Sequence, residues 1–220
     1  IDYTITVQSG TASQPTANYG NTVTIVADAP DAGKEFSSWT IEVGEGASIT
    51  NATNATTTLT VGMGNVVVKA NYTWTEYTIT VNNGTPSQTT AHMGEQVTIT
   101  AADANIGKEF SKWTLDSGDG ASILTDINSE TVVTIGSSDV VVTATYADVE
   151  YAINVVGGSA NYATATYETT VQLTADTKTG YTFSSWSTDP AVSVSFLNTF
   201  VMPASDIDVT ANFTPNSYTI

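Results

Sequence analysis

Apolar and polar residues alternate along most of the chain, and a period of two predicts β-strands rather than helices. The alternation is clearest over residues 3–7, 23–27, 39–43, 59–61 and 66–72. No stretch has a 3.6-residue period long enough for a helix, so we expect an all-β fold.

The same pattern returns along the chain as an internal repeat. Tyr3-Thr4-Ile5-Thr6-Val7 recurs 74 residues later as Tyr77-Thr78-Ile79-Thr80-Val81, and Tyr151-Ala152-Ile153-Asn154-Val155 opens a third copy after the same interval. We therefore expect three repeats, at residues 1–76, 77–150 and 151–217. Residues 218–220 begin the motif again, so we expect the chain to be a piece of a longer array whose signal or anchor lies elsewhere.

The pattern of apolar residues within each repeat predicts a small unit of five or six mainly antiparallel strands, either sandwich-like or related to the β-grasp fold. Residues 10–20 are expected to form an edge strand or a loop that Pro15 interrupts. The segments Glu130–Ile135 and Val140–Tyr146 are expected to pair with each other.

One heptapeptide recurs in every repeat as Gly, two variable residues, Phe, Ser, one variable residue and Trp. It occupies residues 33–39, 107–113 and 180–186. Gly permits a tight turn, and the two large aromatic residues that follow are expected to enter the core of each repeat. Lys108, Glu109 and Lys112 vary between copies and are expected on the surface.

The repeats are joined by short connectors, residues 72–77 and 146–151, which contain neither Gly nor Pro. Such connectors restrict hinging, so we expect a semi-rigid rod. If each repeat were a compact domain roughly 30 Å across, three would measure about 90 Å.

Charge removes several classes of partner. The formal net charge is −17, with no Arg, and the acidic residues are spread over all three repeats. Binding to nucleic acid or to anionic lipid needs clustered Lys and Arg, so neither is expected. No run of 18 apolar residues occurs, so this fragment should not insert into a membrane. The absence of Cys excludes disulfides and leaves the compartment open.

Catalytic chemistry has few candidates. His92 is the single histidine and corresponds to Asn18 in the first repeat, so we interpret it as a surface substitution. Glu35 and Glu109 become Thr182 in the third repeat, and Glu42 and Asp116 fall near Thr188. Paired carboxylates for glycoside hydrolysis are therefore not maintained between repeats. We expect no enzyme, no catalytic residue and no cofactor, and the sequence leaves any ligand-binding residues unknown.

Calcium is the one ion with some support, because it binds oxygen ligands on loops. Residues 116–120, Asp-Ser-Gly-Asp-Gly, resemble part of a calcium loop, and Asp28 and Asp31 flank another turn.

Lys69 is the candidate for an isopeptide cross-link, but Thr replaces it in the other repeats. Trp74 could stack on a sugar or pack across a joint, and the second interpretation is favoured. Glycosylation sequons occur at about the frequency that chance gives, at Asn51, Asn54, Asn71, Asn83 and Asn212.

The order of these motifs resembles a known family. Tyr-x-Ile-x-Val, Gly-x-x-Val-x-Ile-x-Ala, Gly-x-x-Phe-Ser-x-Trp and a final Val-x-Val-x-Ala-x-Tyr follow one another as in the divergent InlB B-repeats and the related Listeria–Bacteroides repeats. The resemblance implies secreted or surface-attached bacterial proteins in which the repeats act as spacers, with no shared catalytic or ligand residues. Its better-studied members have a β-grasp-like fold with a helix, whereas the second half of each repeat here favours an all-β unit.

Three functions follow as hypotheses. The first is a stalk of a bacterial surface adhesin, located outside the cell, that projects another domain and contacts neighbouring repeats of the same chain. The second is a module that binds a carbohydrate or a host protein. The third is a fibre subunit that associates with copies of itself through strand edges.

Overall fold

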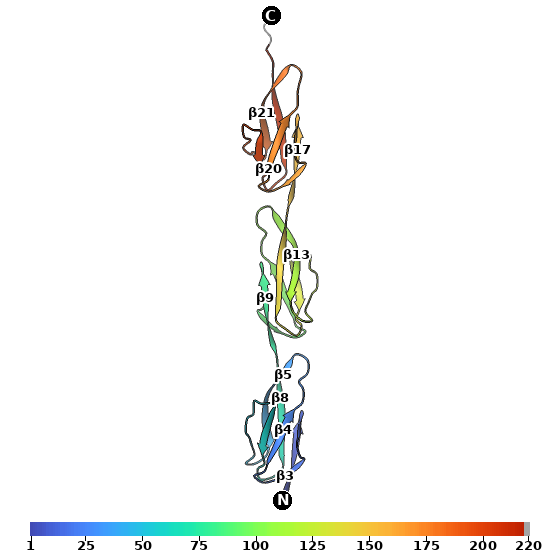
Figure 1. Ribbon diagram of the computed structural model, residues 1–220, viewed down its shortest axis with the longest axis vertical. Coiled ribbons are helices and arrows are strands. Elements are labelled where there is room, and N and C mark those ends of the chain that lie inside the picture. The colour runs from blue at the N-terminus through green and yellow to red at the C-terminus, as the bar shows by residue number, and fades with distance from the viewer. Residues whose placement is uncertain (218–220) are drawn as a thin grey trace.

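The computed structural model describes residues 1–217 and shows three β-repeats arranged end to end in one line (Figure 1). This range contains strands and turns and no helix, so the all-β prediction is confirmed and the β-grasp helix is absent from it. The predicted start of a fourth repeat, at 218–220, lies outside the described residues. Nothing within residues 1–217 has the helical length and apolarity needed to cross a bilayer.

Repeat one is a sandwich of two four-stranded sheets. The first sheet has the order β3-β1-β8-β5 and the second has the order β2-β4-β7-β6. The strands are β1 (Asp2–Gln8), β2 (Gly10–Ala12), β3 (Thr16–Asn18), β4 (Thr22–Ala27), β5 (Lys34–Val43), β6 (Ser48–Ile49), β7 (Thr56–Thr60) and β8 (Val66–Trp74).

Repeats two and three follow the same plan. Repeat two contains β9 (Glu76–Asn82), β10 (Gly84–Pro86), β11 (Thr90–His92), β12 (Gln96–Ala101), β13 (Lys108–Ser117), β14 (Ser122–Ile123), β15 (Glu130–Thr134) and β16 (Val140–Asp148). Repeat three contains β17 (Glu150–Val156), β18 (Gly158–Ala160), β19 (Thr164–Thr166), β20 (Thr170–Ala175), β21 (Tyr181–Asp189), β22 (Thr199–Val201) and β23 (Ile207–Pro215). Repeat three lacks a counterpart of β6, so its second sheet has the order β18-β20-β22.

The chain passes from the first sheet to the second directly after its opening strand. Ser9 makes this change with a φ of +57°, and Asn83 and Gly157 occupy the same place with φ of +56° and +74°. Left-handed backbone is costly for most residues and easy for Gly, which explains the Gly in repeat three. The uncertain stretch 10–20 therefore contains two short edge strands, one in each sheet, with Pro15 between them.

Two details of the predicted strand arrangement are wrong. Repeats one and two each have eight strands and repeat three has seven, because the two-residue and three-residue strands give little periodic signal. The segments expected to pair, β15 and β16, lie in different sheets. β16 instead runs parallel to β9 and antiparallel to β13, because the chain crosses the sandwich between β15 and β16.

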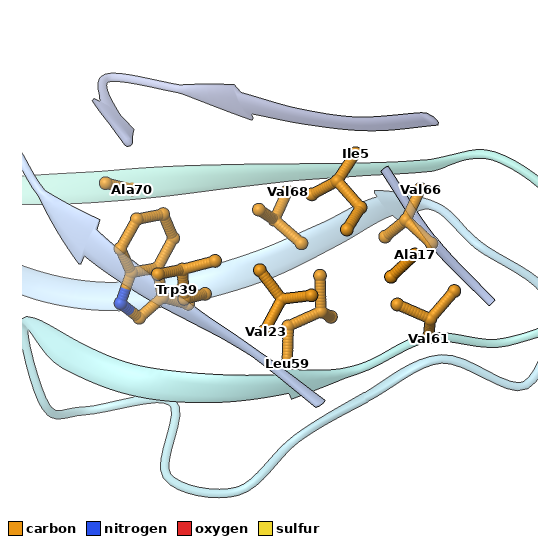
Figure 2. Close-up of a cluster of buried hydrophobic side chains, with 10 residues drawn as sticks. Ile5, Ala17, Val23, Trp39, Leu59, Val61, Val66, Val68 and Ala70 are labelled. Carbon is orange, nitrogen blue, oxygen red and sulfur yellow. The ribbon is translucent and has the colours of Figure 1, made fainter. Parts of the chain in front are cut away.

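Each repeat encloses its own core between the two sheets. In repeat one, Ile5, Val23, Trp39, Leu59 and Val68 point into the same space from both sheets (Figure 2). Phe36 contacts this cluster from its edge, with ring centroids 5.8 Å from Trp39 and 6.1 Å from Tyr72. The predicted core role of the recurring Phe and Trp therefore matches their position in repeats one and two, whereas in repeat three Trp186 is only half-buried.

The strands run along the axis of the rod, which makes each repeat longer than a compact domain (Figure 1). Val66 pairs with Ile5 in parallel register, and the chain then continues upward to Ile79, the equivalent of Ile5 in the next repeat. These 13 residues, at ~3.3 Å per residue, give an axial rise of ~43 Å per repeat. Three repeats then span ~130 Å, so the compact-domain expectation of about 90 Å is too short.

Candidate functional site

The joints between repeats are the recurring structural feature that a function could use. At the first joint β8 ends at Trp74 and β9 begins at Glu76, so Thr75 alone separates the two strands. The Thr75 N–H donates a 2.9 Å hydrogen bond to the carbonyl of Gly33. The last strand of one repeat thus becomes the first strand of the next with almost no free chain between them.

Gly33 lies at the turn before β5 and faces repeat two. Its φ is +76°, and a Cβ at this position would lie 2.9 Å from the Met93 Cβ and 3.3 Å from the Trp74 ring. Those approaches are shorter than side-chain carbons normally make, so the contact requires a residue without a Cβ. The glycine that opens the recurring heptapeptide therefore serves the joint as well as the turn.

The second joint repeats this geometry with different side chains. Val149 alone separates β16 from β17, and its N–H donates a 2.9 Å hydrogen bond to the carbonyl of Gly107. Gly107 also has a φ of +76°, and a Cβ there would overlap the Cβ of Tyr167 in repeat three. Both joints therefore place a Cα of one repeat against residue 93 or 167 of the next.

Gly180, at the far end of repeat three, shows what the same turn looks like without that contact. Its φ is +81° and its carbonyl accepts a 2.8 Å hydrogen bond from the Asn216 N–H. A Cβ at Gly180 would meet no atom of residues 1–217 within 4 Å. At the opposite end, Tyr19 is 62% exposed, whereas its equivalent Tyr167 is 36% exposed within the second joint.

Lysine side chains of the preceding repeat contact the strand that leads into each joint, in a different way at each one. At the first joint the Lys34 Nζ lies 5.1 Å from the centre of the Trp74 ring, a cation–π arrangement, and the Trp74 ring lies 6.0 Å from His92. At the second joint Lys108 forms an ion pair with Asp148, with 2.6 Å between Nζ and Oδ1. Both pairs are partly exposed, so each contributes a modest stabilisation.

His92 and Trp74 thus meet at the first joint. His92 is half-buried against Trp74 and not fully on the surface, and its backbone N–H donates to Glu95 Oε2 at 2.9 Å. That hydrogen bond is the main reason why the pKa of Glu95 lies below its usual value. The favoured interpretation of Trp74, packing across the joint, agrees with its position between Lys34 and His92.

The acidic candidates do not gather into a site. Glu35 and Glu109 are exposed on β5 and β13, in separate repeats. Asp116 accepts hydrogen bonds from Thr114 and Thr143. Among residues 1–217 no group of three or more His, Cys, Asp or Glu side chains is placed to hold a metal ion.

Two further candidates have structural roles. Asp31 pairs with Lys34 at 3.2 Å, and the carbonyl of Asp28 accepts a 2.8 Å hydrogen bond from the Tyr72 hydroxyl. Burial raises the pKa of Tyr72, and the carboxylates of Asp28 and Asp31 raise it further. Lys69 is exposed on β8, so it lacks the buried surroundings that an isopeptide cross-link needs.

Sequence reasoning missed the contact role of Gly33 and Gly107, because a glycine in a turn already has a sufficient explanation. The position of Gly33 in the sequence was the available signal. Gly33 precedes the strand that pairs with the last residues before the joint, so its turn had to lie at that end of the repeat.

The comparison with known families agrees with the repeat structure. The model of the divergent InlB B-repeat domain matches residues 3–76, 77–150 and 151–217, which is nearly the whole chain. No curated protein matches it.

Proposed function

The chain belongs to the family of divergent InlB B-repeat domains, which are repeat domains of bacterial surface proteins, and we propose that it acts as a stalk that projects another domain from the cell. The observation that carries this proposal is the strand that continues through each joint. One residue between strands, fixed by a hydrogen bond to a packed glycine, leaves little freedom for bending.

The surface chemistry supports a passive spacer. The outer positions of the strands carry Thr and other polar residues, and the net charge of −17 makes neighbouring rods repel each other. We propose that the chain has no catalytic role, because the acidic candidates are dispersed over separate repeats. Its contribution is length and stiffness, at ~43 Å per repeat.

A fibre assembled through strand edges is the weaker alternative, because the edges are poor templates. β2, β3 and β6 are edge strands of two or three residues. The long edge strand β5 has register shifts between Phe36 and Ser38 and between Ile41 and Val43. Short edges and bulges both oppose the addition of a further strand.

Small-angle X-ray scattering of the chain in solution tests the stalk. We expect a maximum dimension of ~130 Å with a rod-like cross-section, from the strand rise through each joint. The profile should be the same at low and high protein concentration. A maximum dimension near 90 Å, or a profile typical of a flexible chain of beads, would contradict the proposal, and growth of long particles with concentration would favour the fibre.

A further inference from the structure

Repeat three departs from the other two at the segment that covers its core tryptophan. In repeats one and two the Trp backbone N–H donates to the carbonyl of Ala52 or Asp126, at 2.7 Å in both cases. Trp39 and Trp113 are 3% and 2% exposed. The segment between β21 and β22 is shorter and contains no counterpart of β6, and Trp186 is only half-buried.

The shortened segment leaves a cleft of about 340 Å³ beside Trp186. Three aromatic residues line it, Phe183 and Trp186 on β21 and Phe196 on the turn before β22. The remaining lining is small apolar residues and the polar side chains of Ser184, Ser185, Ser195 and Asn198, and none of the lining residues is charged.

Phe196 stands at the apex of this turn and is 93% exposed. The turn itself is well fixed. The Ser195 Oγ accepts hydrogen bonds from the backbone N–H groups of Leu197 and Thr199, both at 3.2 Å. The Asn198 N–H donates to the carbonyl of Ser195 at 2.9 Å. An aromatic side chain is thus held in water on a rigid support.

Two side chains tie this turn to the body of the repeat. The Trp186 indole N–H donates to Asn198 Oδ1 at 3.1 Å. On the other side, Gln172 Nε2 donates to the carbonyls of Leu197 and Asn198 at 2.9 and 3.2 Å. Thr24 and Thr98 occupy the Gln172 position in the other repeats, so this anchor belongs to repeat three alone.

We propose that the cleft of repeat three binds a neutral oligosaccharide. The C–H face of a pyranose ring carries slightly positive hydrogens, which are attracted to the negative face of an aromatic ring. The sugar hydroxyls at the ring edge match the hydroxyl and amide groups of Ser184 and Asn198. An uncharged lining in a protein of net charge −17 disfavours an anionic glycan.

The size of the aromatic surface favours a sugar over a protein partner. A stable protein interface needs roughly 1,000 Å² or more with a buried apolar centre. Here the aromatic lining consists of three rings around one cleft of about 340 Å³, with Ser and Asn side chains among them. Because the turn is fixed before binding, a sugar would pay little ordering cost.

Nuclear magnetic resonance of the whole ¹⁵N-labelled chain tests the site, with cellohexaose, chitohexaose, maltohexaose and mannohexaose as probes. The four tryptophans give four indole N–H signals, so each repeat reports separately. We expect at least one sugar to shift the Trp186 indole and the amides of residues 183–199, with a Kd of about 0.1–5 mM. The Trp39 and Trp113 signals should stay in place, because their rings are covered.

Two variants sharpen the assignment. Phe196→Ala removes an exposed side chain, so folding should be unaffected while the affinity falls about tenfold or more. Gln172→Thr installs the residue of repeats one and two, and should weaken binding by loosening the turn. The proposal fails if none of the sugars shifts the Trp186 signal, or if Phe196→Ala leaves the affinity unchanged. If the amide signals of residues 195–199 shifted with protein concentration in the absence of sugar, the cleft would instead be a site of self-association.

Discussion

The substitution Gly107→Ala should open the second joint, and Gly180→Ala provides its matched control. Both glycines lie at the same place in the recurring heptapeptide, with φ of +76° and +81°. An Ala in this left-handed region costs about 1–2 kcal/mol at either position. The two substitutions differ in what the new methyl group meets, which is Tyr167 at Gly107 and open space among the described residues at Gly180.

The magnitudes favour opening of the joint over compression. Keeping the joint closed around an added methyl group costs about 1–3 kcal/mol, the usual range for overpacking. The joint itself covers about a quarter of Tyr167, judged from exposures of 62% for Tyr19 and 36% for Tyr167. For an aromatic side chain this is roughly 40–60 Å², which contributes about 1–1.5 kcal/mol. Burial of Tyr167 at the joint stabilises the closed form by no more than the added methyl group destabilises it. We therefore expect the contact between repeats two and three to open.

Distance measurements between spin labels can detect this change. The chain has no Cys, so Ser137→Cys and Ala204→Cys introduce labels at exposed, equivalent positions in repeats two and three. We expect a narrow distance distribution in the parent and in Gly180→Ala, and a broad one in Gly107→Ala. Both glycine variants should lower the melting temperature by a similar amount, since they share the backbone strain.

The reasoning would be refuted by either of two results. A distribution in Gly107→Ala as narrow as that of the parent would mean that the joint absorbs the methyl group. Equal broadening in Gly180→Ala would mean that strain in the turn, and not the contact with Tyr167, controls the angle between repeats.

Three further predictions concern single repeats. Trp113→Ala should destabilise repeat two by about 3–5 kcal/mol, seen as earlier thermal unfolding of that repeat alone, and an unchanged melting profile would contradict its core role. Ser9→Gly should stabilise repeat one by about 0.5–1 kcal/mol in denaturant unfolding, because it removes left-handed strain where repeat three already has Gly157. The pKa of Tyr72 is raised in the folded state. Its contribution to the stability of repeat one is therefore complete below the usual pKa of about 10 and is lost as the pH rises above that value. Tyr72→Phe should remove this alkaline loss from repeat one, and a melting temperature that falls equally in both proteins above that pH would disprove it.

The sequence was sufficient for features that depend on side-chain periodicity. Alternation at Tyr3, Ile5 and Val7 identified a strand with one buried face, and the recurrence of the motif 74 residues later identified the repeat. The strand pairing was out of reach for a physical reason. Val66 and Ile5 are far apart in sequence, and alternation specifies which face of a strand is buried but not which neighbour it meets.

The candidate sites were harder to predict for a related reason. The cleft beside Trp186 exists because repeat three lacks the strand that corresponds to β6, so no segment fully covers the Trp186 ring. The shorter spacing between Trp186 and Phe200 was visible in the sequence, yet spacing alone does not show whether the remaining loop closes over the ring. Gln172, which fixes the turn of Phe196, looks like an ordinary outward-facing strand residue until its partners are known.

In this array the residues that join the repeats and the residues that cover each core tryptophan lie in different places. The joint positions lie at the ends of each repeat, where Gly33 and Gly107 keep the same backbone conformation and the same hydrogen bond. The segment that covers the core tryptophan lies on the side, where a change does not alter the path of the strands through the joint. Repeat three can therefore lose a strand and expose Phe196 while β16 and β17 still run into one another through Val149. A lateral binding site of the kind proposed for repeat three would therefore leave the length and direction of the rod unchanged.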